Sequence, residues 1–130
     1  VMETRISHAH ATVMVVDDEA FFRKLLRDIL QRAGYTVIAE AADGKAAVDA
    51  FSLHRPDITL IDIYMPEKNG MEATKEILSI DRSAKVVICS ALGCDEDVEF
   101  SLQVGARAVI QKPFIESEVL DTIAQVLSGK

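Results

Sequence analysis

The sequence places carboxylates at the ends of two apolar stretches, and acids grouped in this way can bind protons or a hard cation. Asp62 stands near the end of the run from Ile58 to Ile63, and Asp17 and Asp18 follow directly on the run from Thr12 to Val16. Burying an unpaired charge is costly, so acids at such positions need a partner. An all-oxygen site with open water positions suits Mg²⁺.

Each acid also has a structural explanation. Asp favours turns, so Asp62 taken alone could be a turn residue. Asp18 or Glu19 could cap the helix that follows them. Neither explanation accounts for acids at the ends of two separate strands, and these alternatives stay open at this point.

A lysine and a serine occupy similar positions later in the chain. Lys112 follows the apolar run from Ala108 to Ile110, and Ser90 closes the run from Lys85 to Cys89. A lysine ammonium suits a carboxylate or a phosphoryl oxygen, and a hydroxyl can donate a hydrogen bond to an added oxygen. Taken alone, Ser90 is typical of a turn.

Short apolar runs alternate with segments of helical periodicity, and this order must position the polar residues. Strands are predicted at 12–16, 35–40, 58–63, 85–89 and 106–111, and helices at 21–33, 44–54, 71–80, 98–104 and 115–127. Five alternations with short connections predict an α/β fold: a doubly wound parallel sheet with right-handed crossovers and five helices on both faces. The carboxyl ends of parallel strands share one edge, where open sheets of this kind bind ligands.

Two details of the helices are also expected. Phe21 belongs to the apolar stripe of the first helix, together with Phe22 and Leu25. The segment from Gly93 to Asp97 is expected to be an acidic loop whose charges suit the positive end of the helix that starts near Val98.

The order of these parts resembles the receiver domain of two-component response regulators, with a leaning towards the chemotaxis (CheY-like) type. The marks are Asp17-Asp18, then Asp62 with Met65-Pro66 and Asn69-Gly70, then Ser90-Ala91, then Lys112-Pro113-Phe114. They extend over nearly the whole chain. The resemblance implies a flavodoxin-like sheet with strand order 2-1-3-4-5 and a cis peptide bond between Lys112 and Pro113.

The resemblance also implies roles for the marked residues. Asp62 would be the phosphoacceptor. Asp17, Asp18, Asp62 and the backbone carbonyl of Tyr64 would hold Mg²⁺, with Mn²⁺ as an alternative ion. Lys112, Ser90 and Ala91 would bind phosphoryl oxygens, and movement of Ser90 would carry the signal.

Three positions set the behaviour of this chain apart. Val109 stands where the family has an aromatic switch residue, and a small aliphatic side chain cannot swing as a ring does. Coupling is therefore expected to run through Ser90 and the loop from Ala91 to Asp97. Tyr64 and Leu92 flank the expected path of the hydrolytic water, so slow self-dephosphorylation is predicted.

The partners implied are a sensor histidine kinase and an output protein or phosphatase. The output partner would bind the face formed by the fourth helix, the fifth strand and the fifth helix. The chain is expected to act alone, as in chemotaxis, and to be monomeric when unphosphorylated. The alternatives are a phosphorelay intermediate and a receiver cut from a longer transcriptional regulator.

Other functional classes fit less well. An aspartate-dependent phosphatase would want a second acid where Tyr64 stands, and the acids from Asp17 to Glu19 would repel a flavin phosphate. No enzymatic activity is expected beyond self-phosphorylation and slow dephosphorylation. A phosphorylation-independent binding module on the same fold is the alternative of another class.

Length and composition support these expectations. The 130 residues predict one receiver domain at 12–130, preceded by a tail or cloning remnant at 1–11. The net charge of -7 and the absence of a basic run argue against direct binding of nucleic acid. The chain contains no apolar stretch of membrane-spanning length, and Cys89 and Cys94 lack the spacing of a metal site, so a reducing cytoplasm is expected.

Overall fold

Strands and helices alternate along the chain in the order that the sequence pattern predicts. A computed structural model of the protein describes residues 10–91, 93 and 95–129. The strands are β1 (Thr12–Val16), β2 (Thr36–Ala41), β3 (Ile58–Asp62), β4 (Val86–Ser90) and β5 (Ala108–Gln111). The helices are α2 (Ala20–Arg32), α3 (Gly44–His54), α4 (Gly70–Ile80), α5 (Asp95–Val104) and α6 (Glu116–Leu127).

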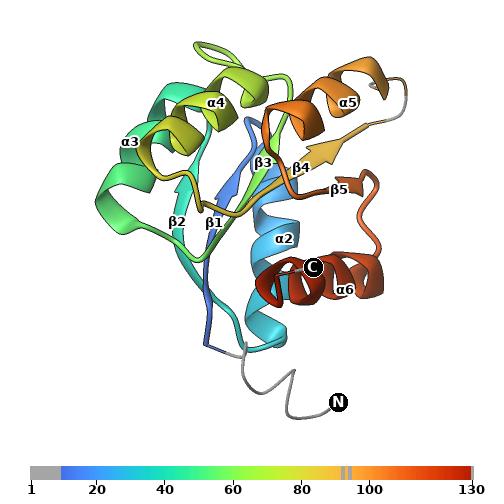
Figure 1. Cartoon of the computed structure of the whole chain (residues 1–130). Helices are drawn as coiled ribbons and strands as arrows, with labels where there is room; N and C mark the ends of the chain where they lie inside the picture. Colours follow the sequence, from blue (N-terminus) through green and yellow to red (C-terminus); the bar gives the residue numbers. More distant parts are fainter. Residues whose placement is uncertain (1–9, 92, 94, 130) are drawn as a thin grey trace.

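The strands form one parallel sheet with the order β2-β1-β3-β4-β5, and this confirms the predicted flavodoxin-like fold class. In Figure 1, α2 and α6 cover one face of the sheet, and α3, α4 and α5 cover the other. The sheet is therefore the middle of three layers. All its strands end at the same edge, since they run in the same direction.

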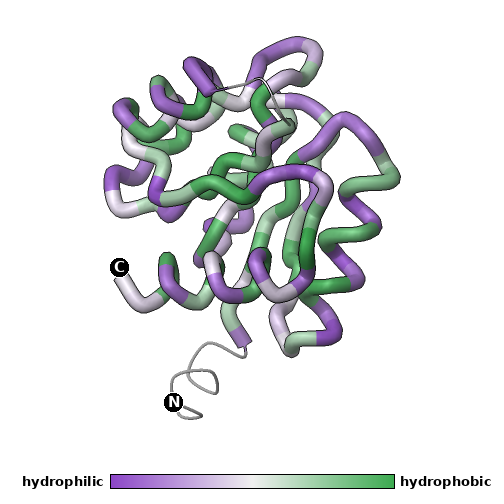
Figure 2. The backbone as a smooth tube through the Cα atoms, turned by 90° about the vertical axis from the view of Figure 1, so that its right-hand side faces the viewer, coloured by the Kyte–Doolittle hydropathy of each residue, from purple (hydrophilic) through white to green (hydrophobic). Residues whose placement is uncertain are grey.

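The core lies between the sheet and its two helical layers. Every residue of β3 and β4 is buried, as expected for central strands covered on both faces. Figure 2 shows the strands mostly in green, while the surrounding helices alternate between green and purple. Each large aliphatic side chain buried here contributes about 1.5–3 kcal/mol. The polar residues at the strand ends are thus attached to a rigid frame.

Two expectations about the helices were wrong. Phe21 is 70% exposed, whereas Phe22 packs edge to face against Phe114 at 5.7 Å. Adjacent residues on a helix point about 100° apart, so only one of the two rings packs against Phe114. The acidic segment is not a loop before α5: Asp95 to Asp97 form the first turn of that helix. Their negative charges lie at the positive end of the helix dipole and interact favourably with it, as expected.

In the described part of the chain, no helix has the length and apolar character needed to cross a bilayer. Most of the predicted tail, residues 1–9, lies outside the described residues, as does Leu92. The predicted domain boundary at residue 12 stays a prediction.

Candidate functional site

The register of the sheet brings the two groups of acids together. Val16 pairs with Ile61 across β1 and β3, so the residues that follow them, Asp17 and Asp62, are neighbours at the carboxyl edge. On its other side Asp62 pairs with Cys89 of β4. The convergence predicted from strand ends is therefore present in the fold.

Asp17, Asp18 and Asp62 form a carboxylate cluster. One oxygen from each lies within 4.8 Å of the others, a spacing at which the three could hold one metal ion. Asp17 is 1% exposed and Asp62 is 8% exposed, while Asp18 faces solvent. Oδ2 of Asp17 is buried, and its neighbour is the ammonium of Lys112. An all-carboxylate donor set fits a hard divalent cation.

Lys112 extends from the end of β5 over the same edge. Its Nζ lies 2.8 Å from Oδ2 of Asp17 and 3.4 Å from Oδ1 of Asp62. The ammonium also lies 4.1 Å from the centre of the Phe22 ring, a cation–π contact. The peptide bond between Lys112 and Pro113 is cis. The lysine thus neutralises part of the acid charge in a partly buried place.

The surroundings of Asp62 change its proton affinity. Two effects raise the pKa of Asp62 to about 6: burial, which is the larger, and the neighbouring charge of Asp17. The charge and hydrogen bond of Lys112 oppose both effects. At pH 7.5 the carboxyl is therefore mostly ionised, yet held in an unfavourable place. A bound cation there would relieve this cost.

The loop after β3 is held tightly against the Asp62 backbone. Asn69 caps α4 with a capping box: its side chain accepts from the backbone N–H of Glu72, whose side chain accepts from the N–H of Asn69. Gly70 donates its N–H to the carbonyl of Ile63 at 2.6 Å. A Cβ on Gly70 would lie 2.0 Å from the carbonyl oxygen of Asp62, so only glycine fits.

The start of α2 is organised around Asp17. Its Oδ1 accepts from the backbone N–H of Glu19 at 2.9 Å, and its carbonyl accepts from Arg23 at 2.6 Å. Glu19 occupies the N-cap position without a side-chain cap bond, so the capping alternative for Glu19 does not hold. Sequence reasoning missed the contacts of Arg23 and Phe22 and the close approach of Gly70. Only the Asn69-Gly70 pair gave a local signal.

The other predicted residues lie around this cluster. Ser90 ends β4 and is 5% exposed, and its carbonyl accepts from the N–H of Lys112 at 2.7 Å. Ala91 follows it and is exposed, and Val109 is half-buried on β5. The Tyr64 side chain is 55% exposed in the loop after β3; the role of its carbonyl stays a prediction.

A doubly wound sheet that gathers these acids and a lysine at its carboxyl edge defines a class of signalling domain. The family model of the response regulator receiver domain matches residues 13–124, and the chain belongs to this family.

Its relatives include chemotaxis proteins. The chain is 45% identical to the chemotaxis protein CheY of Thermotoga maritima over 114 residues, 88% of this chain and 95% of that protein. It is 36% identical to the transcriptional regulatory protein PdtaR of Mycobacterium tuberculosis, over 89% of this chain and 56% of that protein.

Among solved structures, the chain resembles one from the CheX-CheY-BeF3-Mg²⁺ complex of Borrelia burgdorferi. The TM-score is 0.86 at 36% identity, over 89% of this chain and 88% of that one. Both the sequence and the fold thus agree with a CheY-like receiver.

Proposed function

We propose that Asp62 accepts a phosphoryl group from a phosphohistidine of a sensor histidine kinase. The observation that carries this proposal is the convergence of Asp62 with Asp17, Asp18 and Lys112 at one sheet edge. A lone turn acid would need no such neighbours.

The transfer exchanges one bond to phosphorus for another. An oxygen of the Asp62 carboxylate forms a bond to phosphorus as the phosphorus–nitrogen bond of the donor breaks. The electron pair of that bond stays on the imidazole nitrogen, which then takes a proton. Lys112 lies within reach to pair with an oxygen of the transferred group, and this needs its contact with Asp62 to loosen.

Asp17, Asp18, Asp62 and the carbonyl of Tyr64 would hold Mg²⁺, or Mn²⁺ in its place. When bound, the cation screens the repulsion between carboxylate and phosphoryl oxygens. The approach of one oxygen from each of the three carboxylates to within 4.8 Å of the others supports this assignment. In the Borrelia burgdorferi complex, Mg²⁺ and BeF3 accompany the related CheY.

The signal would leave through the face formed by α5, β5 and α6. Ser90 stands between the acid cluster and this face, because its strand β4 lies between β3 and β5. We propose that Ser90 turns towards the new phosphoryl oxygens and that the segment from Ala91 to Asp97 follows. Val109 replaces the aromatic switch, so the change of a ring rotamer plays no part.

Two positions are proposed to control the lifetime of the phosphorylated state. Tyr64 is a bulky side chain in the loop after Asp62, and it would hinder a water that attacks phosphorus in line with the phosphorus–oxygen bond of the acyl phosphate. Leu92, which lies outside the described residues, has the same proposed role. The protein would then dephosphorylate slowly and would catalyse no other reaction.

We further propose that the protein works in the cytoplasm as a chemotaxis-type regulator, monomeric when unphosphorylated, with a kinase and an output protein or phosphatase as partners. The similarity to chemotaxis CheY proteins over nearly their whole length supports this. The similarity to PdtaR, a longer regulatory protein, supports the alternative of a receiver from a longer regulator; a phosphorelay intermediate is a further alternative.

Intact mass spectrometry tests the phosphorylation. The protein is incubated with acetyl phosphate and Mg²⁺, alongside Asp62→Asn, a sample with chelator, and the matched surface variant Asp49→Asn. We expect one added phosphoryl group in the wild type and in Asp49→Asn, and none in the other two samples. No gain under any condition would contradict the proposal and would favour a phosphorylation-independent binding module.

A further inference from the structure

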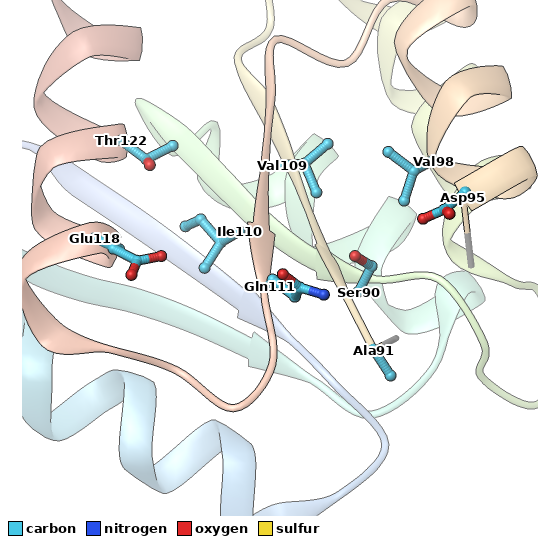
Figure 3. A pocket seen from close by; sticks show the side chains of 9 residues that line it. All are labelled: Ser90, Ala91, Asp95, Val98, Val109, Ile110, Gln111, Glu118 and Thr122. Carbon is cyan, nitrogen blue, oxygen red and sulfur yellow. The ribbon is translucent and has the colours of Figure 1, made fainter. Parts of the chain in front are cut away.

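A pocket of about 320 Å³ crosses β5 between α5 and α6. Figure 3 shows Asp95 and Val98 reaching it from α5, and Glu118 and Thr122 reaching it from α6, on opposite sides of the strand. At this volume the pocket is at the lower end of the range for small-ligand sites and suits a few side chains of a partner.

Three branched aliphatic residues are among those that line the pocket. Val109 and Ile110 of β5 line it together with Val98 of α5. Leu102 stands one helical turn after Val98 and is 42% exposed, so it extends this apolar surface along the same face of α5. The hydroxyl-bearing Ser90, which is 5% exposed, lies at the end nearest the acid cluster.

The two helices that border the pocket carry only negative charge. The sequence of α5 contains four acidic residues and that of α6 three, and neither contains a lysine or an arginine. Of the three on α6, Glu116 is paired with Arg32 of α2, but Asp95 and Glu118 are exposed and take part in none of the ion pairs between described residues. Arg107 precedes β5 at the strand's other end.

We propose that this pocket binds a basic segment of a partner protein. Two basic side chains of the segment would pair with Asp95 and Glu118, and an apolar residue between them would cover Val98 and Val109. Arginine suits these places better than lysine, because its planar fork matches a carboxylate and its stem packs on apolar surface. The inference rests on the proposed function in one respect, that this face is the one that contacts the output partner.

The charge pattern argues against other occupants. A second copy in a two-fold arrangement would place the acidic helices α5 and α6 against themselves, and like charges repel. Nucleic acid would be repelled by the same surface. An apolar segment without basic residues would leave the carboxylates at both rims without partners.

The test is a titration of the ¹⁵N-labelled full chain with the peptide acetyl-Arg-Ala-Leu-Ala-Arg-amide, followed by amide shifts. We expect saturable shifts at Val98, Val109 and Ile110, and no saturation with the glutamine analogue acetyl-Gln-Ala-Leu-Ala-Gln-amide. The double variant Asp95→Asn with Glu118→Gln should bind at least about fivefold more weakly, which corresponds to about 1 kcal/mol.

A matched control separates the pocket from net charge. The double variant Asp28→Asn with Asp49→Asn loses the same two charges away from the pocket and should bind as the wild type does. Equal weakening in both double variants, or shifts spread over the whole surface, would overturn the proposal, because binding would then follow net charge alone. Shifts at α3 and α4 instead would overturn it as well.

Phosphorylation of the same samples is followed by intact mass. This measurement distinguishes a failure of the proposed peptide binding from a failure of the proposed phosphorylation at Asp62. Wild-type protein that gains a phosphoryl group but does not bind the arginine peptide overturns this inference and leaves the proposed function standing. Protein that binds the peptide at the pocket without gaining a phosphoryl group supports the pocket and contradicts the proposed chemistry.

Discussion

Nζ of Lys112 lies 2.8 Å from Oδ2 of Asp17, closer than the 3.4 Å that separate it from Oδ1 of Asp62. Burial lowers the pKa of Lys112, but the bond to Asp17 and the charge of Asp62 outweigh burial, so the pKa is raised and the lysine stays charged. In the absence of a metal ion, this single cation therefore compensates both buried acids. The proposed reaction would need it to exchange a carboxylate for a phosphoryl oxygen.

Lys112→Met should destabilise the metal-free protein. Because a buried ion pair that loses one partner leaves an uncompensated charge, we expect a loss of about 2–3 kcal/mol at pH 7.5. The loss should shrink at pH 5, where Asp62, with its pKa of about 6, can take a proton. Urea unfolding with chelator at both pH values measures this.

Lys24→Met is the matched control. Lys24 forms an exposed pair with Asp28 one turn along α2, and solvent screens such pairs so strongly that they contribute little to stability. An equal loss in the two variants would show that the position of Lys112 over the acids does not matter.

Asp62→Asn should change how stability depends on pH. A folded pKa of about 6, against 3.8 for the free side chain, means that the folded state binds the proton more tightly. Wild-type stability therefore falls as pH rises from about 4 to about 6, and the asparagine variant lacks this fall. With chelator present, the free energy of unfolding of the variant, relative to that of the wild type, should rise by about 1–2 kcal/mol between pH 4 and pH 7.5, after allowing for solvent screening. A constant difference across this range would contradict the raised pKa.

Asp18→Asn should separate metal binding from folding. Asp18 faces solvent, so its neutralisation should change the metal-free free energy of unfolding by less than about 0.5 kcal/mol. In the wild type, Mg²⁺ at 10–100 times its Kd should add about 1.4–2.7 kcal/mol, and the variant should lose most of this gain. Urea unfolding with chelator and with Mg²⁺ measures both quantities. A full response to Mg²⁺ in Asp18→Asn would remove Asp18 from the ligand set.

Much of this arrangement could be predicted because it depends on periodicity. The apolar runs before Asp17, Asp62 and Lys112 define strands, and parallel strands must end at one edge. The preference of Lys112 for Asp17 depends on tenths of an ångström in the sheet, which no pattern encodes. The exposure of Phe21 depends on which of two adjacent rings meets Phe114, a contact between residues far apart in sequence.

Tyr64→Asn together with Leu92→Glu should speed loss of the phosphoryl group. Asparagine in place of the tyrosine ring leaves more room, and the polar side chains at both positions would admit and orient a water in line with the phosphorus–oxygen bond of the acyl phosphate. We expect a rate about tenfold higher, which corresponds to about 1.4 kcal/mol of barrier. Decay of the phosphorylated mass after removal of acetyl phosphate measures it, with Phe21→Ala as an exposed aromatic control. Unchanged decay in the double variant would mean that access of water is controlled elsewhere.

Gly70→Ala should destabilise the protein although alanine is the better helix former. The new Cβ would stand 2.0 Å from the carbonyl oxygen of Asp62, a backbone atom that cannot move without shifting the end of β3. We expect a loss of at least about 3 kcal/mol in urea unfolding, at the upper end of the range for single substitutions. Ser79→Ala, on the exposed side of the same helix, should stay within about 0.5 kcal/mol of the wild type. If Gly70→Ala still folds, its rate of phosphorylation should fall as well, since the displaced backbone carries the Asp62 carboxylate. Stability equal to that of the wild type would mean that the loop after β3 can shift without moving Asp62. The capping box of α4 alone would then position that loop.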